Sequence, residues 1–415
     1  MEIRRSWEFL NGLEIKYGDS FYLIDPGTFR KNYAKFLGEF RKHYPHTNIA
    51  YSYKTNYTPK LCQLVNDWGG YAEVVSRMEY DLALRIGVAP EKIIFNGPYK
   101  PEADLELALA AGSILHLDSP YELELVEAVA RRHEDKYLKV GIRCNFDLGT
   151  GHISRFGFDA ESSDLSTAIR RMREIQNCSV IGLHCHFLTP GNRAESYRLM
   201  ARRMLELTVD HFVGQPPRYI DLGGGFFSQM APELKQQFEN PIPSFEEYAE
   251  AIAPQFAQTF RGDCEPELLL EPGMAITADV MSFVVRVMDI KKIRSRKVAL
   301  VSGSIYNIKP TLHSKNLPIS VIKPGDVMVS RSPESQVDIV GYTCMEHDVL
   351  YKSYPGALSV GDYIVFSNVG SYTTVLKPPF INPCPAMIAY DPATGECELV
   401  KRKETGLDIF STYTF

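Results

Sequence analysis

Residues 113–145, SILHLDSPYELELVEAVARRHEDKYLKVGIRCN, contain the repeating unit that decides the fold. A short apolar run, SILHLDS (113–119), comes first, then a charged amphipathic stretch, and then a second apolar run, LKVGIRCN (138–145). Short apolar runs separated by a helical period predict two strands joined by a helix. The same order recurs from about residue 29 to residue 275.

Eight apolar runs of this kind occur in the first two thirds of the chain. Because they are apolar almost throughout, they indicate strands buried on both faces, as in a parallel sheet covered by helices. Eight strand and helix units in roughly 250 residues favour an α/β fold with a closed (β/α)8 TIM barrel over an open doubly wound sheet. The predicted strands are NIAYSY (48–53), GYAEVVS (70–76), KIIFNG (92–97), SILHLDS (113–119), LKVGIRCN (138–145), VIGLHCHF (180–187), RYIDLGGG (218–225) and ELLLEPG (267–273).

The pattern changes after residue 275. Strand-like alternation separated by turns rich in Pro and Gly replaces the helical periods, as in SFVVRVMDIKKI (282–293) and YTTVL (372–376). The first 25 residues also look strand-like, with FYLID (21–25) as the clearest example. The sequence therefore predicts a barrel domain over residues 26–275 and a β-rich domain formed by residues 1–25 and 276–415.

Composition limits the class of protein. The 415 residues are 45% hydrophobic and 23% charged, as in ordinary globular proteins, and the formal charge of -6 argues against nucleic acid as the main partner. No apolar stretch approaches the roughly 20 residues of a membrane span, so we expect a cytoplasmic protein without membrane contact. The eight cysteines include no CxxC pair, which predicts reduced thiols.

Several residues suited to catalysis follow predicted barrel strands. Chemistry in a barrel of this kind takes place at the carboxyl ends of the strands. Lys54 follows the first strand beside aromatic residues, and partly apolar surroundings favour a neutral, nucleophilic amine. Gly223–Gly225 follow the seventh strand, where glycine backbone can hold a phosphate. His184 and His186 share one face of the sixth strand, and Glu271 follows the eighth.

Eight segments in order resemble the fold-type III pyridoxal-phosphate (PLP) decarboxylases, the family of diaminopimelate, ornithine and arginine decarboxylases that is related to alanine racemase. The resemblance extends over about residues 20 to 392. It rests on AYSYKTN (50–56), which is followed by GGYAEVVSRMEYDLAL (69–84) and FNGPYK (95–100), and on GLHCHFLT (182–189), DLGGGF (221–226), EPGM (271–274), GYTCMEHD (341–348) and VGSYTTV (369–375).

The resemblance implies pyridoxal 5'-phosphate as the cofactor and decarboxylation of an amino acid as the reaction. Lys54 would form the Schiff base, His186 would stack on the ring, and Cys344 would give a proton to Cα. In the family this cysteine comes from the second subunit, which implies a homodimer with shared active sites. The cofactor contacts implied by the resemblance are Lys54, Arg143, His186, Thr189, Gly223, Gly224, Gly225, Glu271, Gly273 and Tyr372, with Glu73 as a weaker candidate.

Two methionines depart from the family pattern. Met274 stands where the family usually has an arginine near the phosphate, and Met345 stands where it has an acidic residue that meets a distal ammonium group of the substrate. Simple ornithine, lysine or diaminopimelate handling then requires another carboxylate, and Glu346 and Asp348 are the candidates. Without one, the substrate carries a distal group that is anionic or uncharged.

A cationic segment supports that expectation. SIYNIKPTLHSKN (304–316) resembles a substrate-reading stretch of the diaminopimelate enzymes, with Lys309 in place of an arginine and His313 in place of a tyrosine. With Lys315, these residues suit a distal carboxylate or another anion. We therefore expect a specialised-metabolism branch that acts on an amino acid or an intermediate derived from one, either free or attached to a carrier protein.

Two alternatives stay open on the sequence. An amino-acid racemase of the alanine-racemase type shares the barrel and the lysine, although GYTCMEHD (341–348) favours the decarboxylase. A catalytically inactive regulatory or binding homologue is the other alternative, since the two methionine departures affect cofactor and substrate positions. No metal site is expected, because no third ligand follows the two histidines of the sixth strand at a usual spacing.

Overall fold

The structure, a computed structural model, describes residues 6–149, 151, 153–187, 190–262, 265–326 and 336–415. The chain divides into two compact units. One contains residues 32–227 and 240–275, and the other contains residues 1–31, 228–239 and 276–415. Each unit is built around its own sheet.

The first unit contains a closed barrel of eight parallel strands. The order is β5-β4-β3-β2-β10-β9-β8-β6, and a pairing between β5 and β6 closes the ring. This confirms the (β/α)8 prediction. The strands are β2 (Thr47–Ser52), β3 (Tyr71–Val74), β4 (Ile93–Phe95), β5 (Ile114–Leu117), β6 (Leu138–Asn145), β8 (Cys178–His184), β9 (Tyr219–Asp221) and β10 (Glu267–Leu270), and the short β7 (Phe158–Asp159) pairs with the end of β6.

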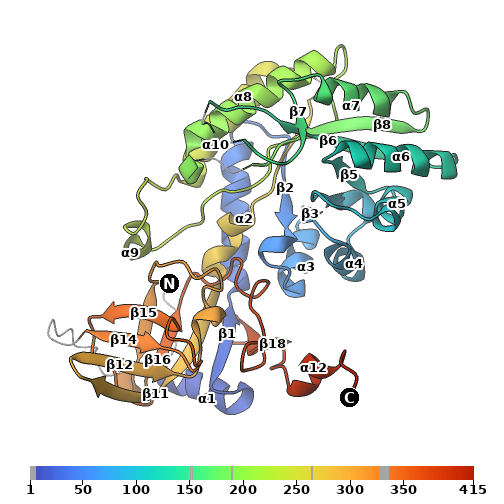
Figure 1. Cartoon of the computed structure of the whole chain (residues 1–415). Helices are drawn as coiled ribbons and strands as arrows, with labels where there is room; N and C mark the ends of the chain where they lie inside the picture. The colour runs from blue at the N-terminus through green and yellow to red at the C-terminus, as the bar shows by residue number, and fades with distance from the viewer. Residues whose placement is uncertain (1–5, 150, 152, 188–189, 263–264, 327–335) are drawn as a thin grey trace. The chain divides into compact units, whose positions relative to one another are not determined.

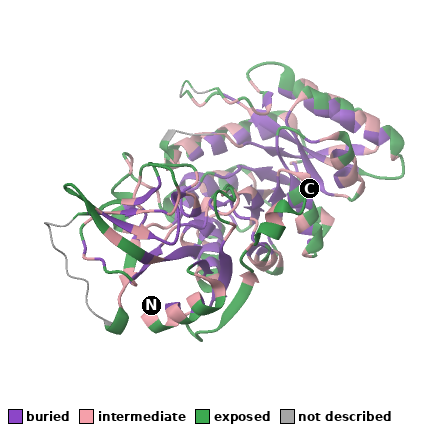
Figure 2. Ribbon diagram, turned by 60° about the horizontal axis from the view of Figure 1, so that its bottom comes forward, coloured by how far each residue is buried: buried purple, intermediate pink, exposed green. Residues whose placement is uncertain are grey.

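Helices alternate with these strands along the chain and surround them (Figure 1). Their inner faces are apolar and buried, whereas their outer faces are exposed (Figure 2). Within the described ranges, no helix has both the length and the apolar content that crossing a membrane requires. The helices are α2 (Pro26–Arg41), α3 (Pro59–Asp67), α4 (Arg77–Arg85), α5 (Glu102–Ala110), α6 (Pro120–Arg132), α7 (Asp164–Arg173), α8 (Ala194–His211) and α10 (Phe245–Thr259).

Tyr219 fills much of the barrel interior. Its ring lies over two glycines on neighbouring strands: a Cβ atom on Gly182 would lie 2.3 Å from the ring, and a Cβ atom on Gly141 would lie 2.3 Å from the hydroxyl oxygen. The hydroxyl group is 2.7 Å from Nε2 of His116. The two glycines are therefore needed for space, because any side chain there would overlap the tyrosine.

The second unit is β-rich, as predicted. β1 lies between β11, to which it is antiparallel, and β17, to which it is parallel, so the N-terminal strand joins the C-terminal domain. The strands are β1 (Ser20–Ile24), β11 (Met281–Ile293), β12 (Arg296–Val301), β13 (Ile319–Ile322), β14 (Val337–Val340), β15 (Val349–Tyr354), β16 (Tyr363–Phe366), β17 (Ala386–Tyr390) and β18 (Cys397–Lys401), and the helices α9 (Pro232–Lys235) and α12 (Gly406–Phe410) belong to the same unit.

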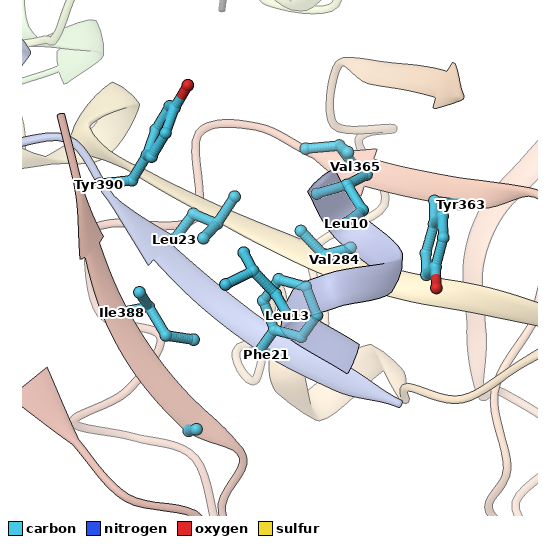
Figure 3. Packing of buried hydrophobic residues seen from close by; sticks show 10 residues of the cluster. Leu10, Leu13, Phe21, Leu23, Val284, Tyr363, Val365, Ile388 and Tyr390 are labelled. Carbon is cyan, nitrogen blue, oxygen red and sulfur yellow. The ribbon is translucent and has the colours of Figure 1, made fainter. Parts of the chain in front are cut away.

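The structure differs from the sequence-based expectations in three segments. Residues 7–17 form helix α1 (Trp7–Tyr17) instead of continuing the strand-like start, and its Leu10 and Leu13 pack against Phe21 in the core of this unit (Figure 3). Residues 228–239, predicted as barrel, belong to the β-rich unit. Residues 372–376 form a bend followed by a turn instead of a strand.

Replacement of Gly182 by Ala should destabilise the barrel. The added methyl group must displace the Tyr219 ring, and overpacking of this kind costs about 1–3 kcal/mol. A suitable control is Gly38→Ala in α2, where a Cβ atom would meet nothing within 4 Å. Because alanine favours a helix more than glycine does, this variant should gain about 0.5–1 kcal/mol in free energy of unfolding. Urea unfolding of the two variants should give shifts of opposite sign. Equal stability of Gly182→Ala and wild type would contradict the packing described here.

Candidate functional site

Lys54 lies at the carboxyl end of β2, in the short helical turn Tyr53–Thr55. Its Nζ atom is 2.5 Å from Oε2 of Glu73 and 2.7 Å from Oγ of Ser52, and 29% of its side chain is exposed. Ser52 also donates a hydrogen bond to Oε2 of Glu73. The amine is therefore directed to a buried carboxylate instead of to bulk water, as a site at the barrel mouth requires.

Glu73, at the end of β3, is the ionic partner of this lysine. Burial raises the pKa of its carboxyl group, but the charge of Lys54 and the hydrogen bonds from Lys54, Ser52 and Asn96 outweigh burial and hold the pKa below its ordinary value. Glu73 is therefore a carboxylate at neutral pH. Glu73 is only a weaker candidate from the sequence, whereas the structure places it in direct contact with Lys54.

Glu271 lies on the far side of Glu73, after strand β10. The Nδ2 atom of Asn96, which follows β4, donates to Oε1 of Glu73 at 3.0 Å and to Oε1 of Glu271 at 2.5 Å. Burial, followed by the charges of Glu73 and Asp221, raises the pKa of Glu271 well above its ordinary value. Four side chains from four strand ends thus form the continuous chain Lys54–Glu73–Asn96–Glu271.

A second layer of polar groups lies next to Glu271. The Nε2 atom of His184 is 3.5 Å from Oε1 of Glu271, and the His184 ring stacks on His116 with centroids 4.5 Å apart. Burial raises the pKa of Asp221 to about 7, and its Oδ1 atom accepts the N–H of Gly223 at 2.9 Å. Four buried side chains each place one atom of a type that can bind a metal ion within 4.8 Å of the others; they are His116, His184, Asp221 and Glu271. The sequence predicts His184 and Glu271 as separate residues, but it predicts no role for His116, Asp221 or Asn96.

His186 and Arg143 are adjacent. Nδ1 of His186 accepts the N–H of Gly224 at 2.9 Å, and Arg143 donates to the backbone oxygen of His186. Burial, then the charges of Lys54 and Arg143, lowers the pKa of His186 to about 3, so its ring is neutral. Arg143 is itself held by Asp118, with 3.0 Å between NH1 and Oδ1.

The glycine loop after β9 has the backbone conformation that a cradle for an anion needs. Gly223 and Gly225 have φ angles of 67° and 90°, in the left-handed region that glycine adopts without strain. A Cβ atom on Gly224 would lie 2.4 Å from the backbone oxygen of Glu271. The loop is therefore closely packed against the residues that position Glu271. Gly273 is similarly close to the lysine turn, because a Cβ atom there would lie 2.0 Å from Oγ1 of Thr55.

Cys344 lies on an exposed loop of the β-rich unit. Asp348 holds this loop: its Oδ1 atom accepts the N–H of Ile305 at 2.6 Å and its Oδ2 atom accepts the N–H of Thr343 at 3.0 Å. Because Asp348 is buried and both oxygens bind backbone groups, it supports the cysteine loop and is not free to meet a substrate ammonium group. This corrects the expectation from sequence. Met345 and Glu346 are exposed on the same loop.

Tyr372 and Lys309 lie elsewhere in the β-rich unit. Tyr372 has a φ of 54°, and the hydroxyl groups of Ser371 and Thr277 are 3.0 Å apart. Lys309 is buried, its Nζ donates to the backbone oxygen of Lys315 at 3.0 Å, and burial lowers its pKa to about 8. His313 is exposed on the turn between these two lysines. Thr189, predicted to contact a phosphate, lies outside the described residues.

The raised pKa of Asp221 predicts a pH-dependent stability of the cofactor-free protein. A carboxyl group with a pKa of about 7 in the folded state, above its ordinary 3.8, binds a proton more tightly in the folded than in the unfolded chain. Its contribution is complete below the ordinary pKa and is lost as the pH rises through 7. Asp221→Asn, which keeps the acceptor for Gly223, should therefore lose less unfolding free energy than wild type between pH 5 and pH 8.

Asp159→Asn is the matched control for urea titrations at both pH values. Asp159 is exposed and also accepts the N–H of the residue two positions later, from Glu161 at 2.9 Å. Its replacement should leave the pH dependence unchanged. An Asp221→Asn variant with the full wild-type pH dependence would show that Asp221 does not hold a proton in the folded state.

Comparisons with known proteins identify the family. A family model described as "Pyridoxal-dependent decarboxylase, pyridoxal binding domain" matches residues 31–278. The chain is 24% identical over 407 residues to a diaminopimelate decarboxylase of Methanothermobacter thermautotrophicus, covering 95% of this chain and 91% of that protein. It is 27% identical over 426 residues to the L-glutamyl-[BtrI acyl-carrier protein] decarboxylase of Niallia circulans, covering 97% and 95%.

The fold is also that of a solved enzyme. A crystal structure of diaminopimelate decarboxylase from M. jannaschii superposes with a TM-score of 0.86 at 23% identity, covering 97% of this chain and 94% of that one. The family match spans more than half of the 415 residues. The chain therefore belongs to the pyridoxal-dependent decarboxylase family and is a PLP-dependent amino-acid decarboxylase.

Proposed function

We propose that this enzyme decarboxylates an amino acid, or an intermediate derived from one, whose distal group is anionic or uncharged instead of an ammonium group. Lys54 is the residue that holds the cofactor. The observation that carries the assignment is the chain Lys54–Glu73–Asn96–Glu271, which links an amine to a second buried carboxyl group across the barrel mouth.

The described residues fit PLP. Glu73, Asp221 and Glu271 are buried carboxyl groups, and the amine of Lys54 faces Glu73. The ring nitrogen of PLP would take a proton from these carboxyl groups and so supply a positive charge beside them. Both ring nitrogens of His184 and Oδ2 of Asp221 are buried without a hydrogen-bond partner among the described residues. Buried polar atoms are usually satisfied, so a bound polar group would complete the site. When bound, PLP supplies an electron sink for the electron pair that remains after CO2 leaves.

Each residue of the barrel has a distinct task in this proposal. Lys54 binds the aldehyde end of the cofactor, and Glu73 keeps that amine at the barrel mouth. Glu271 holds a proton at the ring nitrogen. His186, which is neutral, offers a flat surface for the ring, and the loop Gly223–Gly225 receives the phosphate through its backbone N–H groups.

The proton that replaces the carboxyl group on Cα requires a separate donor. We assign it to Cys344 of the partner subunit in a homodimer with shared sites. A thiol can donate a proton near neutral pH, and Cys344 is exposed on a loop whose backbone is fixed by Asp348. Tyr372 would donate a hydrogen bond to the phosphate from the β-rich domain.

Substrate choice rests on two features of the β-rich unit. Met345 offers no charge at the position where the family has an acid, and Lys309 supplies a buried cationic group. A relative is named for a glutamyl group carried by an acyl-carrier protein, which supports a carrier-bound substrate without a distal ammonium group. The second candidate, diaminopimelate, is favoured by the names of several other relatives.

Replacement of Lys54 and replacement of Cys344 by alanine should give different defects. Lys54→Ala should lose the visible absorption band of the bound cofactor and all activity, because no other amine replaces it. Cys344→Ala should retain the band, because the cofactor still binds. Its rate of CO2 release should fall by about 100-fold or more, or its product should have altered chirality, as expected for loss of a proton donor. Spectra, CO2 release and chiral product analysis measure these effects. Wild-type rate and product for Cys344→Ala would remove it from the mechanism, and racemised substrate without CO2 would favour the racemase alternative.

Substitution of Lys309 should change substrate preference. For glutamate or a glutamyl thioester, Lys309→Met should lower kcat/KM by about tenfold to a hundredfold, the effect of losing a charged hydrogen bond. For substrates with uncharged side chains the change should be small. Lys323→Met is the control, because Lys323 is also largely buried in this unit but is paired with Asp362 at 2.8 Å. If wild type decarboxylates meso-diaminopimelate as fast as every other amino acid offered, the proposed substrate class is wrong.

A further inference from the structure

We propose that Asn96 is a positioning residue that separates the carboxylate serving Lys54 from the carboxylate serving the cofactor ring, and that it fixes both without passing protons between them. The proposal rests on the assignment of Lys54 and Glu271 as cofactor-binding residues. Neither the sequence motifs nor the family comparison assigns Asn96 a role.

The geometry around Asn96 uses its amide nitrogen fully. An amide NH2 group carries two hydrogens, and here one is directed to Glu73 at 3.0 Å and the other to Glu271 at 2.5 Å. Asn96 is 4% exposed, so water cannot readily take over either bond. A hydrogen bond to a charged group is stronger than one between neutral groups, so this one nitrogen stabilises the ionised form of both acids.

The backbone of Asn96 is anchored on both sides. Its N–H donates at 2.7 Å to the backbone oxygen of Val74, the last residue of the strand that carries Glu73. Gly97 follows with a φ of 96°, and its backbone oxygen accepts Nζ of Lys100 at 2.6 Å. Lys100 is fully buried and lies 2.8 Å from Oε1 of Glu122. The Asn96 side chain therefore starts from a rigid turn, and its direction is set by the barrel.

A neutral donor at this position solves an electrostatic problem. Two buried carboxylates in direct contact cannot both ionise, and such a pair shares one proton. Glu73 must be ionised to hold Lys54, whereas Glu271 must be able to exchange a proton with the ring nitrogen. The side-chain amide of Asn96 does not titrate near neutral pH. Its two hydrogen bonds therefore fix the positions of both carboxyl groups, but it carries no proton between them.

The other titratable groups facing Glu271 are compatible with this role. Asp221 contributes a carboxyl group from β9 and His184 an imidazole from β8, 3.5 Å away. Lys54, on the β2 side, faces Glu73 directly. Asp221 and His184 are therefore titratable neighbours that can exchange a proton with Glu271 without involving Asn96.

Isosteric replacement tests the proposal. Asn96→Asp removes both donors and adds a third acid between Glu73 and Glu271. We expect the dissociation constant for PLP, measured by equilibrium dialysis, to rise by about tenfold to a hundredfold. We also expect the pH midpoint of the visible cofactor band to move by about one unit or more, which a purely structural role would not produce. Asn96→Ser, which keeps one donor, should give values between those of wild type and Asn96→Asp.

The matched control is Asn177→Asp, the same exchange directly before the amino end of β8, whereas His184 stands at the carboxyl end of that strand. Nδ2 of Asn177 also donates more than once, to the backbone oxygens of Ala130 at 3.1 Å and His133 at 2.9 Å. This variant should be less stable to urea but should bind PLP with the wild-type dissociation constant and pH midpoint.

The possible outcomes separate this inference from the proposed function. If Asn96→Asp and Asn96→Ser both bind PLP with the wild-type constant and pH midpoint, the separating role of Asn96 is refuted, while the decarboxylase assignment stands. If Asn96→Asp does not fold, the pH midpoint of the cofactor band is measured for Asn96→Ser alone, and a wild-type midpoint refutes the separating role of Asn96. A wild-type protein that shows no cofactor band overturns both.

Discussion

The concentration of acid at the mouth of the barrel is the constraint on which the site depends. Glu73, Asp221 and Glu271 are all buried, and the amine of Lys54 faces one of them directly. An unpaired buried carboxylate is costly, so the cofactor-free chain keeps protons on Asp221 and Glu271, whose pKa values are raised by burial. A protonated ring nitrogen next to Glu271 would supply the missing positive charge. The same excess of acid that destabilises the cofactor-free protein therefore favours binding of PLP.

Closure of the barrel brings these acids together. Residues 54, 73, 96 and 271 follow or end four strands that lie side by side, because β10 pairs with β2, β2 with β3, and β3 with β4. Tyr219 fills the interior against Gly141 and Gly182, which fixes the spacing of the strands below the site. A change in that packing would shift the strand ends and alter every distance in the chain from Lys54 to Glu271.

The sequence predicted the parts of the site that belong to recognisable strand ends. Lys54, His186, Gly223–Gly225 and Glu271 each follow an apolar run, and parallel strands present their carboxyl ends at one face. It did not predict Asn96 or His116, because one polar residue in an apolar strand is equally typical of a satisfied core position. It also assigned Asp348 to the substrate, since a motif shows which residue is present but not which backbone N–H groups its carboxylate binds.

The two units differ in how they hold their functional residues, and this suggests how the family changes substrate while keeping its chemistry. The groups assigned to the cofactor stand on or directly after barrel strands and are fixed by contacts with neighbouring strands. Cys344 and Tyr372 stand instead on loops, where Asp348 accepts the N–H of Thr343 and the hydroxyl group of Thr277 lies 3.0 Å from that of Ser371. A loop held in this way can exchange exposed residues such as Met345 without disturbing the strands. Substrate choice can therefore change by substitution on these loops, whereas a change at Asn96 or Glu73 would alter the charge balance that every reaction at this site needs.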